Sequence, residues 1–140
     1  MKVAVFFIAL FTTLYSYGQA SDQSAVKAVL EKQTESWNKG DLEGFMQGYW
    51  HNDSLMFIGK NGIRWGWKAA LAGYKKGYPD TTAMGKLFFE ILVVKKLSPQ
   101  YIFVVGKFYL KRSIGDLSGH YDLVFKKING QWLIISDHTS

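Results

Sequence analysis

The 140-residue sequence contains no cysteine. The chain therefore forms no disulfide, and it offers no cysteine for a lipoprotein anchor. It has two prolines, and no repeat, low-complexity tract or linker interrupts it. A chain of this length without interruption is expected to fold as one domain with a core of its own.

Acidic residues are few: 11 Asp and Glu stand against 17 Lys and Arg, a formal net charge of +6. The basic residues fall in isolated pairs such as Lys75-Lys76 and Lys126-Lys127, without a stripe of arginine and aromatic residues. This pattern is typical of solvated surface charge, so we expect no nucleic-acid partner. The three histidines have neither HxH nor HxxxH spacing, so we predict no metal and no cofactor.

Long apolar runs are absent except at the N-terminus. Lys2 precedes an apolar and threonine-containing run over residues 3–14, and Ser16 and Gly18 are small residues placed for a peptidase cut before Gln19. The run is shorter than the roughly 20 residues of a transmembrane helix, so we expect no stable membrane anchor. The sequence predicts a signal peptide over residues 1–18, a mature domain over residues 19–140, and a secreted or periplasmic protein.

The full sequence has 48% hydrophobic and 16% aromatic residues, a composition typical of a globular domain, and the pattern after the N-terminal run is that of an α+β fold. Helical spacing of apolar residues predicts a helix that ends near Gly40, and Asp41 is a cap for a second, short one. The Asn61-Gly62 pair predicts a hairpin, and a third helix from residue 67 must end before Pro79. Strands follow over residues 86–95, 101–112, 120–128 and 131–138.

The predicted order is thus ααββαββββ, a curved antiparallel sheet packed on three helices from the N-terminal half. Strands such as residues 101–110 are apolar on both faces. One face must take the helices, and the other must be covered as well. We therefore predict a homodimer formed through the convex face of the sheet.

Four stretches carry a resemblance: "WNKGDLEGFMQGYW", "HNDSLMF", "NGIRWGWKAALAGY" and "GHYDLVFKKINGQWLIISDHTS". They resemble the ketosteroid-isomerase-like and polyketide-cyclase-like branch of the nuclear transport factor two-like (cystatin-like) superfamily, and in particular its exported group of unknown function. The resemblance covers nearly all of the mature chain. It implies a cone-shaped domain, usually dimeric, with an apolar cavity between the sheet and the first helix.

The chemistry of a steroid isomerase is not expected here. That enzyme needs a carboxylate base, with a tyrosine and a protonated aspartic acid as oxyanion donors. The positions that match the tyrosine and the base hold Gln33 and Ile58, which cannot perform these roles. Of the three catalytic positions that the resemblance implies, only the aspartic acid is present, at Asp122, eight residues before Gly130.

A two-residue turn at Asn129-Gly130 sets the expected register of the last hairpin. It pairs Asp122 with Asp137, Val124 with Ile135 and His120 with Thr139, and it places Tyr121 and His138 on the opposite, convex face. The resemblance puts Asp122 on the cavity side. We therefore predict a polar cluster of Asp122, Asp137, His120 and Thr139 above an apolar floor that includes Val124 and Ile135.

Two interpretations of this cluster stay open, because polar strand ends at a solvated rim have the same composition. The cavity is predicted to be lined further by side chains of the helices and the first hairpin, although aromatic residues at helical spacing also fit a filled core. These candidates are Gln33, Trp37, Tyr49, Phe57, Trp65, Trp67, Tyr74 and Tyr78.

The function predicted from the sequence is binding of a small apolar or aromatic molecule. The alternative is an acid–base enzyme, cyclase-, dehydratase- or isomerase-like, in which Asp122, Asp137 and His120 perform the catalysis. A third class is a pure interaction domain that acts through its sheet face. Whether the cavity is open or filled by the chain's own aromatic side chains distinguishes the third class from the other two.

Overall fold

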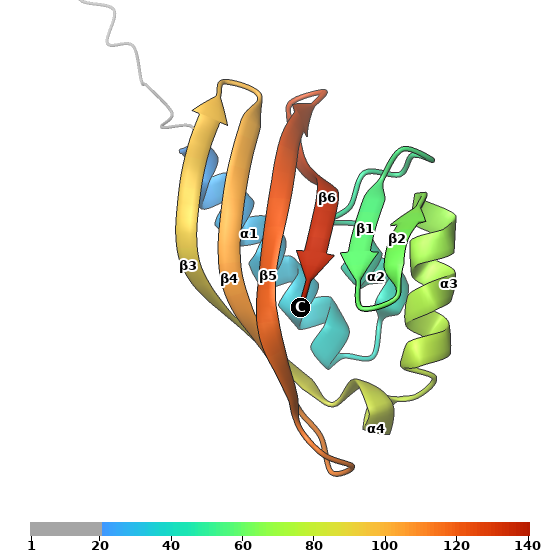
Figure 1. The fold of residues 1–140 in the computed structure, drawn as a ribbon. Helices are drawn as coiled ribbons and strands as arrows, with labels where there is room; N and C mark the ends of the chain where they lie inside the picture. The colour runs from blue at the N-terminus through green and yellow to red at the C-terminus, as the bar shows by residue number, and fades with distance from the viewer. Residues whose placement is uncertain (1–20) are drawn as a thin grey trace, which may run out of the picture.

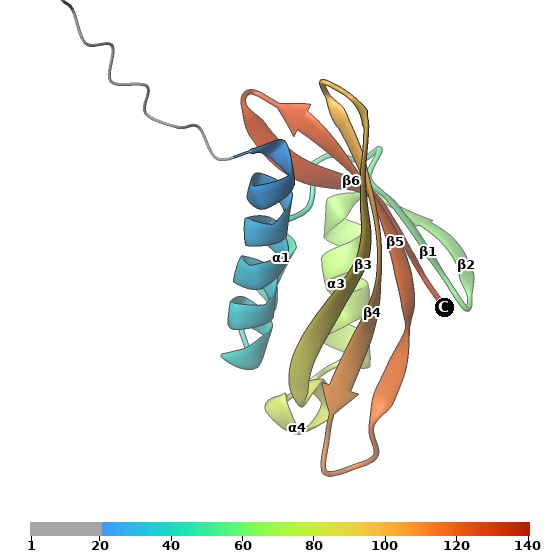
Figure 2. The ribbon, with the colours of Figure 1, turned by 90° about the vertical axis from the view of Figure 1, so that its left-hand side faces the viewer.

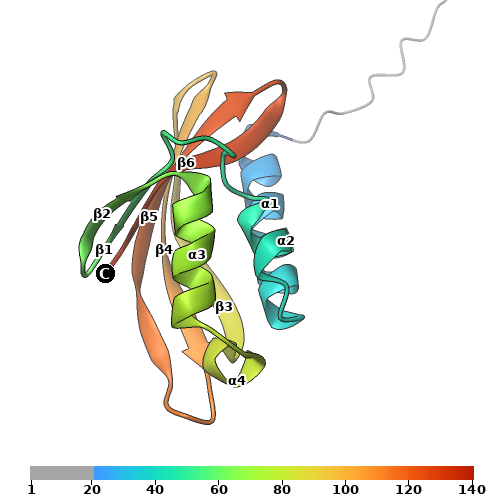
Figure 3. The same ribbon diagram turned by 90° about the vertical axis from the view of Figure 1, so that its right-hand side faces the viewer.

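The computed structural model describes residues 21–140, so the predicted signal peptide, residues 1–18, lies outside the described residues. A curved six-stranded sheet forms one layer, and the helices cover its concave face (Figure 1). The two side views show α1 and α3 on the same side of the sheet (Figure 2) (Figure 3). No helix within residues 21–140 is long and apolar enough to cross a membrane.

The first two helices form where the caps predict them. Ser21 caps α1 (Asp22–Asn38) by accepting a hydrogen bond from the Ser24 amide. Asp41 caps α2 (Leu42–Met46) by accepting one from the Gly44 amide at 2.7 Å. Gly40 separates the two helices and has a φ of 79°, a conformation that glycine adopts without strain. The buried face of α1 consists of Val26, Leu30, Gln33 and Trp37.

Two further helices follow the first hairpin. The predicted third helix is α3 (Trp67–Gly77), which ends before Pro79. A one-turn helix that was not predicted, α4 (Thr81–Met84), follows it and is capped by Asp80, which accepts a hydrogen bond from the Ala83 amide. This short helix leads the chain from α3 to the far edge of the sheet.

The sheet has the strand order β2-β1-β6-β5-β4-β3. All neighbours pair antiparallel except β1 and β6, which run parallel. The predicted α+β class and the curved sheet packed on helices are confirmed, with one parallel pair and one extra helical turn added. The strands are β1 (Met56–Gly59), β2 (Gly62–Trp65), β3 (Lys86–Ser98), β4 (Tyr101–Lys111), β5 (Leu117–Ile128) and β6 (Gln131–Thr139).

A β-bulge in the last hairpin changes the predicted register. Near the turn, Phe125 pairs with Ile134, as predicted, but Val124 pairs with Ser136. Ile135 is therefore an extra residue in β6, and every pair beyond it is shifted by one. The predicted pairings of Asp122 with Asp137, Val124 with Ile135 and His120 with Thr139 are wrong.

Beyond the bulge, Leu123 pairs with Asp137, and Asp122 pairs with His138. On β5, Tyr121, Leu123 and Phe125 are buried against the helices, which places their neighbours His120, Asp122 and Val124 on the outer face. The predicted position of Tyr121 on the convex face is therefore wrong. On β6, Trp132 and Ile134 face inward before the bulge, and Asp137 faces inward after it.

The outer face of the sheet keeps apolar side chains at its surface. Phe88 and Tyr109 are cross-strand partners and are 51% and 38% exposed. Their neighbours along the strands, Leu87 and Leu110, pair with each other and are buried on the inner face. This outer face is the convex face through which the sequence predicts dimer contacts. The homodimer stays a prediction.

Candidate functional site

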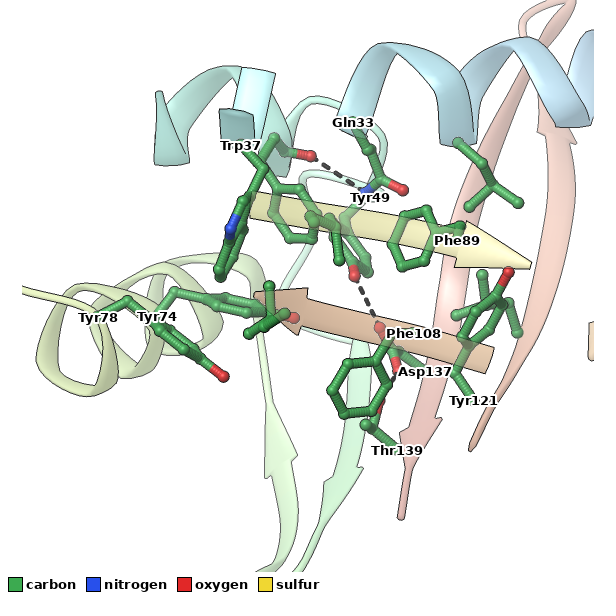
Figure 4. A pocket seen from close by; sticks show the side chains of 15 residues that line it. Gln33, Trp37, Tyr49, Tyr74, Tyr78, Phe89, Phe108, Tyr121, Asp137 and Thr139 are labelled. Carbon is green, nitrogen blue, oxygen red and sulfur yellow. Dashed lines mark hydrogen bonds between the residues drawn. The ribbon is translucent and has the colours of Figure 1, made fainter. Parts of the chain in front are cut away.

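A cavity of about 90 Å³ lies between the inner face of the sheet and the helices (Figure 4). Six of the predicted site residues line it: Gln33, Trp37, Tyr49, Tyr74, Asp137 and Thr139. Tyr78, a further candidate from the sequence, also lines the cavity. Sequence reasoning missed the aromatic residues Phe45, Phe89, Phe108 and Tyr121 and four leucines, Leu30, Leu87, Leu110 and Leu123.

Among residues 21–140, Asp137 is the one carboxyl in the cavity wall, and it is only 4% exposed. Tyr49 Oη donates a hydrogen bond to its Oδ2 at 2.7 Å, and Thr139 Oγ1 donates one to its Oδ1 at 2.9 Å. Within residues 21–140, no ion pair joins Asp137 to a lysine or arginine. A buried carboxylate without a cationic partner destabilises a fold, by several kcal/mol in typical cases, unless hydrogen bonds offset the lost hydration.

Burial raises the pKa of Asp137, and the hydrogen bonds from Tyr49 and Thr139 oppose that rise. Burial also raises the pKa of Tyr49, and the negative charge of Asp137 adds to that effect. The same two causes raise the pKa of Tyr74. The tyrosines therefore keep their protons, while Asp137 takes up a proton more readily than an exposed aspartate does.

The position of Tyr49 follows from the backbone around it. Tyr49 forms an isolated parallel β-bridge with Ile134. The Trp50 amide donates a hydrogen bond to Ile134 O at 2.9 Å. The Tyr49 ring packs against Phe45 and Phe57, with ring centroids 5.8 and 4.9 Å away. The segment after α2 is thereby fixed to β6, which aims the tyrosine hydroxyl at Asp137.

Trp37 and Gln33 bring two polar groups of α1 to the same cavity. Trp37 Nε1 donates to Met84 O at 3.1 Å, so its ring is held across the end of the cavity. Gln33 Nε2 donates to Phe45 O at 3.1 Å, which fixes the orientation of the amide because a carbonyl can only accept. Figure 4 shows the amide oxygen of Gln33 turned the other way, toward the cavity.

Tyr121 supplies a polar group without a partner. Its hydroxyl is the one fully buried side-chain nitrogen or oxygen in residues 21–140 that lacks a hydrogen bond. Burial raises the pKa of Tyr121 to about 12, so the hydroxyl keeps its proton at neutral pH. An unsatisfied buried hydroxyl typically costs about 1–3 kcal/mol of stability.

The structure does not bring the predicted catalytic trio together. His120 is exposed on the outer face, and Asp122 is hydrogen-bonded there to His138 Nδ1 at 2.9 Å. Asp137 alone of the three lines the cavity. Val124 and Ile135, predicted as its floor, do not line it either, because Val124 lies on the outer face of β5 and Ile135 is the bulge residue of β6.

Three predicted aromatic residues also lie outside the cavity wall. Trp65 belongs to the edge strand β2 and is 57% exposed. Trp67 stacks on His51, with centroids 4.1 Å apart, and donates its indole N–H to Met46 O. Phe57 packs behind Tyr49 and Tyr74 and supports them. Within residues 21–140, no group of three or more His, Cys, Asp or Glu side chains is placed to hold a metal ion.

The raised pKa of Asp137 predicts a distinct dependence of stability on pH. Because the folded state binds this proton more tightly than the unfolded state, whose value is near 3.8, the free energy of unfolding should rise as pH falls through the folded pKa. Each unit of pKa difference is worth about 1.4 kcal/mol. Asp22 affects stability in a different pH range. Hydrogen bonds from Lys96 and Lys127 lower its pKa from 3.8 to about 2, so its contribution to the free energy of unfolding is lost only as the pH falls below 3.8.

We therefore expect urea unfolding of the wild type to show a free energy of unfolding that is higher near pH 4 than at neutral pH. The Asp137→Asn variant should lack this slope, because its amide does not titrate. An equal slope in the two proteins would contradict the buried position of the carboxyl.

Comparison with solved structures gives a relative that is similar in both sequence and fold. No protein-family model matches the sequence, and no curated protein matches it. The structure is similar to that of an NTF2-like protein of unknown function from Shewanella oneidensis MR-1, with 42% sequence identity and a TM-score of 0.81. That match covers 84% of this chain and 98% of the other.

More distant structures share the fold. A domain of unknown function with a cystatin-like fold from Nostoc punctiforme PCC 73102 has a TM-score of 0.72 at 18% identity, over 88% of this chain and 78% of its own. A ketosteroid isomerase-like protein from Erwinia carotovora atroseptica SCRI1043 has a TM-score of 0.66 at 17% identity, over 86% of this chain and 95% of its own. On its identity to the Shewanella protein across nearly all of that protein's length, the chain belongs to the NTF2-like family.

Proposed function

We propose that the protein is exported and binds a small, largely apolar molecule in the cavity between the sheet and the helices. The observation that carries the proposal is the carboxyl of Asp137, held inside an aromatic wall by Tyr49 and Thr139 without an ion-pair partner in the described part of the chain. The fold would gain stability from an apolar residue at this position. A few convergent polar groups on an apolar surface are the usual composition of a small-molecule site.

The size of the cavity restricts the ligand. A volume of about 90 Å³ is below the roughly 300–1,000 Å³ of most drug-sized sites and below the roughly 150 Å³ of an apolar cavity that binds benzene. Tyr78, Phe108 and Thr139 are half-buried lining residues, so the cavity is expected to open beside them. The ligand is therefore a molecule of a few heavy atoms, or a single ring that displaces these side chains as it enters.

We expect toluene or cyclohexanone at millimolar concentration to raise the melting temperature of the purified protein, because each would fill the cavity in the folded state alone. The Leu110→Phe variant, which places a larger side chain in the wall, should lose most of this shift. The measurement is thermal unfolding followed by circular dichroism.

The control is the melting curve of Leu110→Phe without a probe, since overpacking typically costs about 1–3 kcal/mol. A cooperative transition shows that the variant folds, so that a lost shift reports on the cavity. If neither probe shifts the wild type, or if both proteins shift equally, the cavity is not the binding site.

An acid–base enzyme of the cyclase, dehydratase or isomerase type is the second candidate. It is favoured by the raised pKa of Asp137, which brings a carboxylate base closer to neutral pH. In such a reaction the Asp137 carboxylate removes a proton from a carbon beside the ligand's carbonyl and later returns it. Asp122 and His120 have no part in this scheme, because they lie on the outer face.

Exchange of the α-protons of cyclohexanone in D₂O tests this candidate. We expect the wild type to accelerate the exchange and Asp137→Asn to lower the rate by about 100-fold, the usual size of a general-base effect. Asp122→Asn is the matched control and should retain the rate. An equal rate with and without wild-type protein would leave ligand binding as the function.

Export and dimerisation are parts of the proposal that one measurement tests. The small residues before Gln19 support a mature N-terminus there, and the exposed Phe88 and Tyr109 support subunit contacts through the outer sheet face. Native mass spectrometry of protein isolated from the medium or periplasm should give twice the mass of a chain that begins at Gln19. A monomer, or a chain that retains Met1, would contradict these parts.

A further inference from the structure

The unpartnered hydroxyl of Tyr121 indicates what kind of ligand the cavity takes. Tyr121 is 4% exposed, lines the cavity, and has no hydrogen-bond partner for its hydroxyl among residues 21–140. In Figure 4 this hydroxyl points toward the α1 side of the cavity and away from Asp137. A phenol that keeps its proton and finds no acceptor within residues 21–140 can donate to a ligand that displaces the side chains covering it.

The position of the Tyr121 ring is built into the sheet. Its cross-strand partner is Gly106, and a Cβ added to Gly106 would lie 2.3 Å from Tyr121 Oη. The absence of a side chain at Gly106 therefore makes room for the end of the ring. On its other side the ring packs edge to face on Phe89, with centroids 5.2 Å apart. The hydroxyl is thus held in place although nothing in the described chain bonds it.

The other polar groups around Asp137 and on α1 differ from the Tyr121 hydroxyl in what they can offer a ligand. Asp137 and the free amide oxygen of Gln33 are acceptors, and the Tyr49 and Thr139 hydroxyls already donate to Asp137. The hydroxyls of Tyr74 and Tyr78 also line the cavity, but the Tyr121 hydroxyl is the one fully buried side-chain donor in residues 21–140 without a partner, so we take it as the donor for an acceptor atom on the ligand. An anionic acceptor would be repelled by the Asp137 carboxylate, which leaves a neutral oxygen.

We propose that Tyr121 determines the specificity of the cavity by donating a hydrogen bond to a neutral oxygen, a carbonyl or a hydroxyl, on an otherwise apolar ligand. This inference rests on the proposed binding function and narrows it to one class of ligand. It assigns Tyr121 a role that depends on its hydroxyl and not on the volume of its ring.

The test compares two probes of similar shape, cyclohexanone and methylcyclohexane, in wild-type protein and in Tyr121→Phe. The dissociation constant of each probe is measured by ligand-observed NMR, and the readout is the preference for the ketone over the hydrocarbon. We expect this preference to fall about tenfold in Tyr121→Phe, the size of one net hydrogen bond. Cyclohexanol is a further probe, which distinguishes a hydroxyl acceptor from a carbonyl.

Tyr109→Phe is the matched control, because the Tyr109 hydroxyl is bonded to Glu90 at 3.2 Å on the outer face. It should leave the preference unchanged. An unchanged preference in Tyr121→Phe, with both probes still bound, would overturn the inference and leave the binding function standing. If no probe binds the wild type, the binding function fails and this inference fails with it.

Two further outcomes are decisive. Tighter binding of cyclohexylammonium than of cyclohexanone would show that the charge of Asp137 selects the ligand, which overturns the role of Tyr121. If Tyr121→Phe does not fold, the wild-type Tyr121 ring resonances answer the same question. We expect cyclohexanone to move them, and signals that stay in place at saturation would contradict the proposed hydrogen bond.

Discussion

The extra residue at Ile135 is the constraint on which the cavity depends. Before it, Trp132 and Ile134 face the helices, and strict alternation would carry Ser136 and His138 inward after them. The bulge reverses this phase, so that Asp137 and Thr139 face the cavity and His138 joins Asp122 outside. One inserted residue thus converts the end of a core strand into the wall of a polar site.

The inward turn of Asp137 requires support from distant parts of the chain. Tyr49, fixed to β6 by its bridge to Ile134, donates one hydrogen bond, and Thr139 on the same strand donates the other. The aromatic side chains around them exclude water and raise the pKa of the carboxyl. The protein therefore keeps a group that weakens its fold within a cavity of otherwise apolar walls, which is the pattern of a functional site more than of a core.

Much of the fold could be predicted from short-range signals, because caps, turn glycines and strand patterns act locally. Gly40 with Asp41, the Asn129-Gly130 turn and Pro79 marked boundaries that the structure shows, whereas the first hairpin turns at Lys60-Asn61, one residue before the predicted Asn61-Gly62 pair. The site was harder to predict because the bulge at Ile135 has no glycine or proline to mark it. Asp137 and Thr139 were placed in the cavity only because two errors, the wrong inner face and the missing bulge, offset each other. For Tyr121 and Asp122, both on β5, only the first error applies. Tyr121 was predicted on the outer face and lies on the inner one, and Asp122 the reverse.

We propose above all that the Asp137 carboxyl lies in a cavity that takes a ligand. The most direct measurement is the side-chain carboxyl ¹³C resonance of Asp137, followed by NMR over pH with and without cyclohexanone. We predict a titration midpoint above the ordinary value of 3.8 and a resonance that moves when the probe is added. A midpoint at or below that value, together with a resonance that the probe leaves unchanged, would contradict the account.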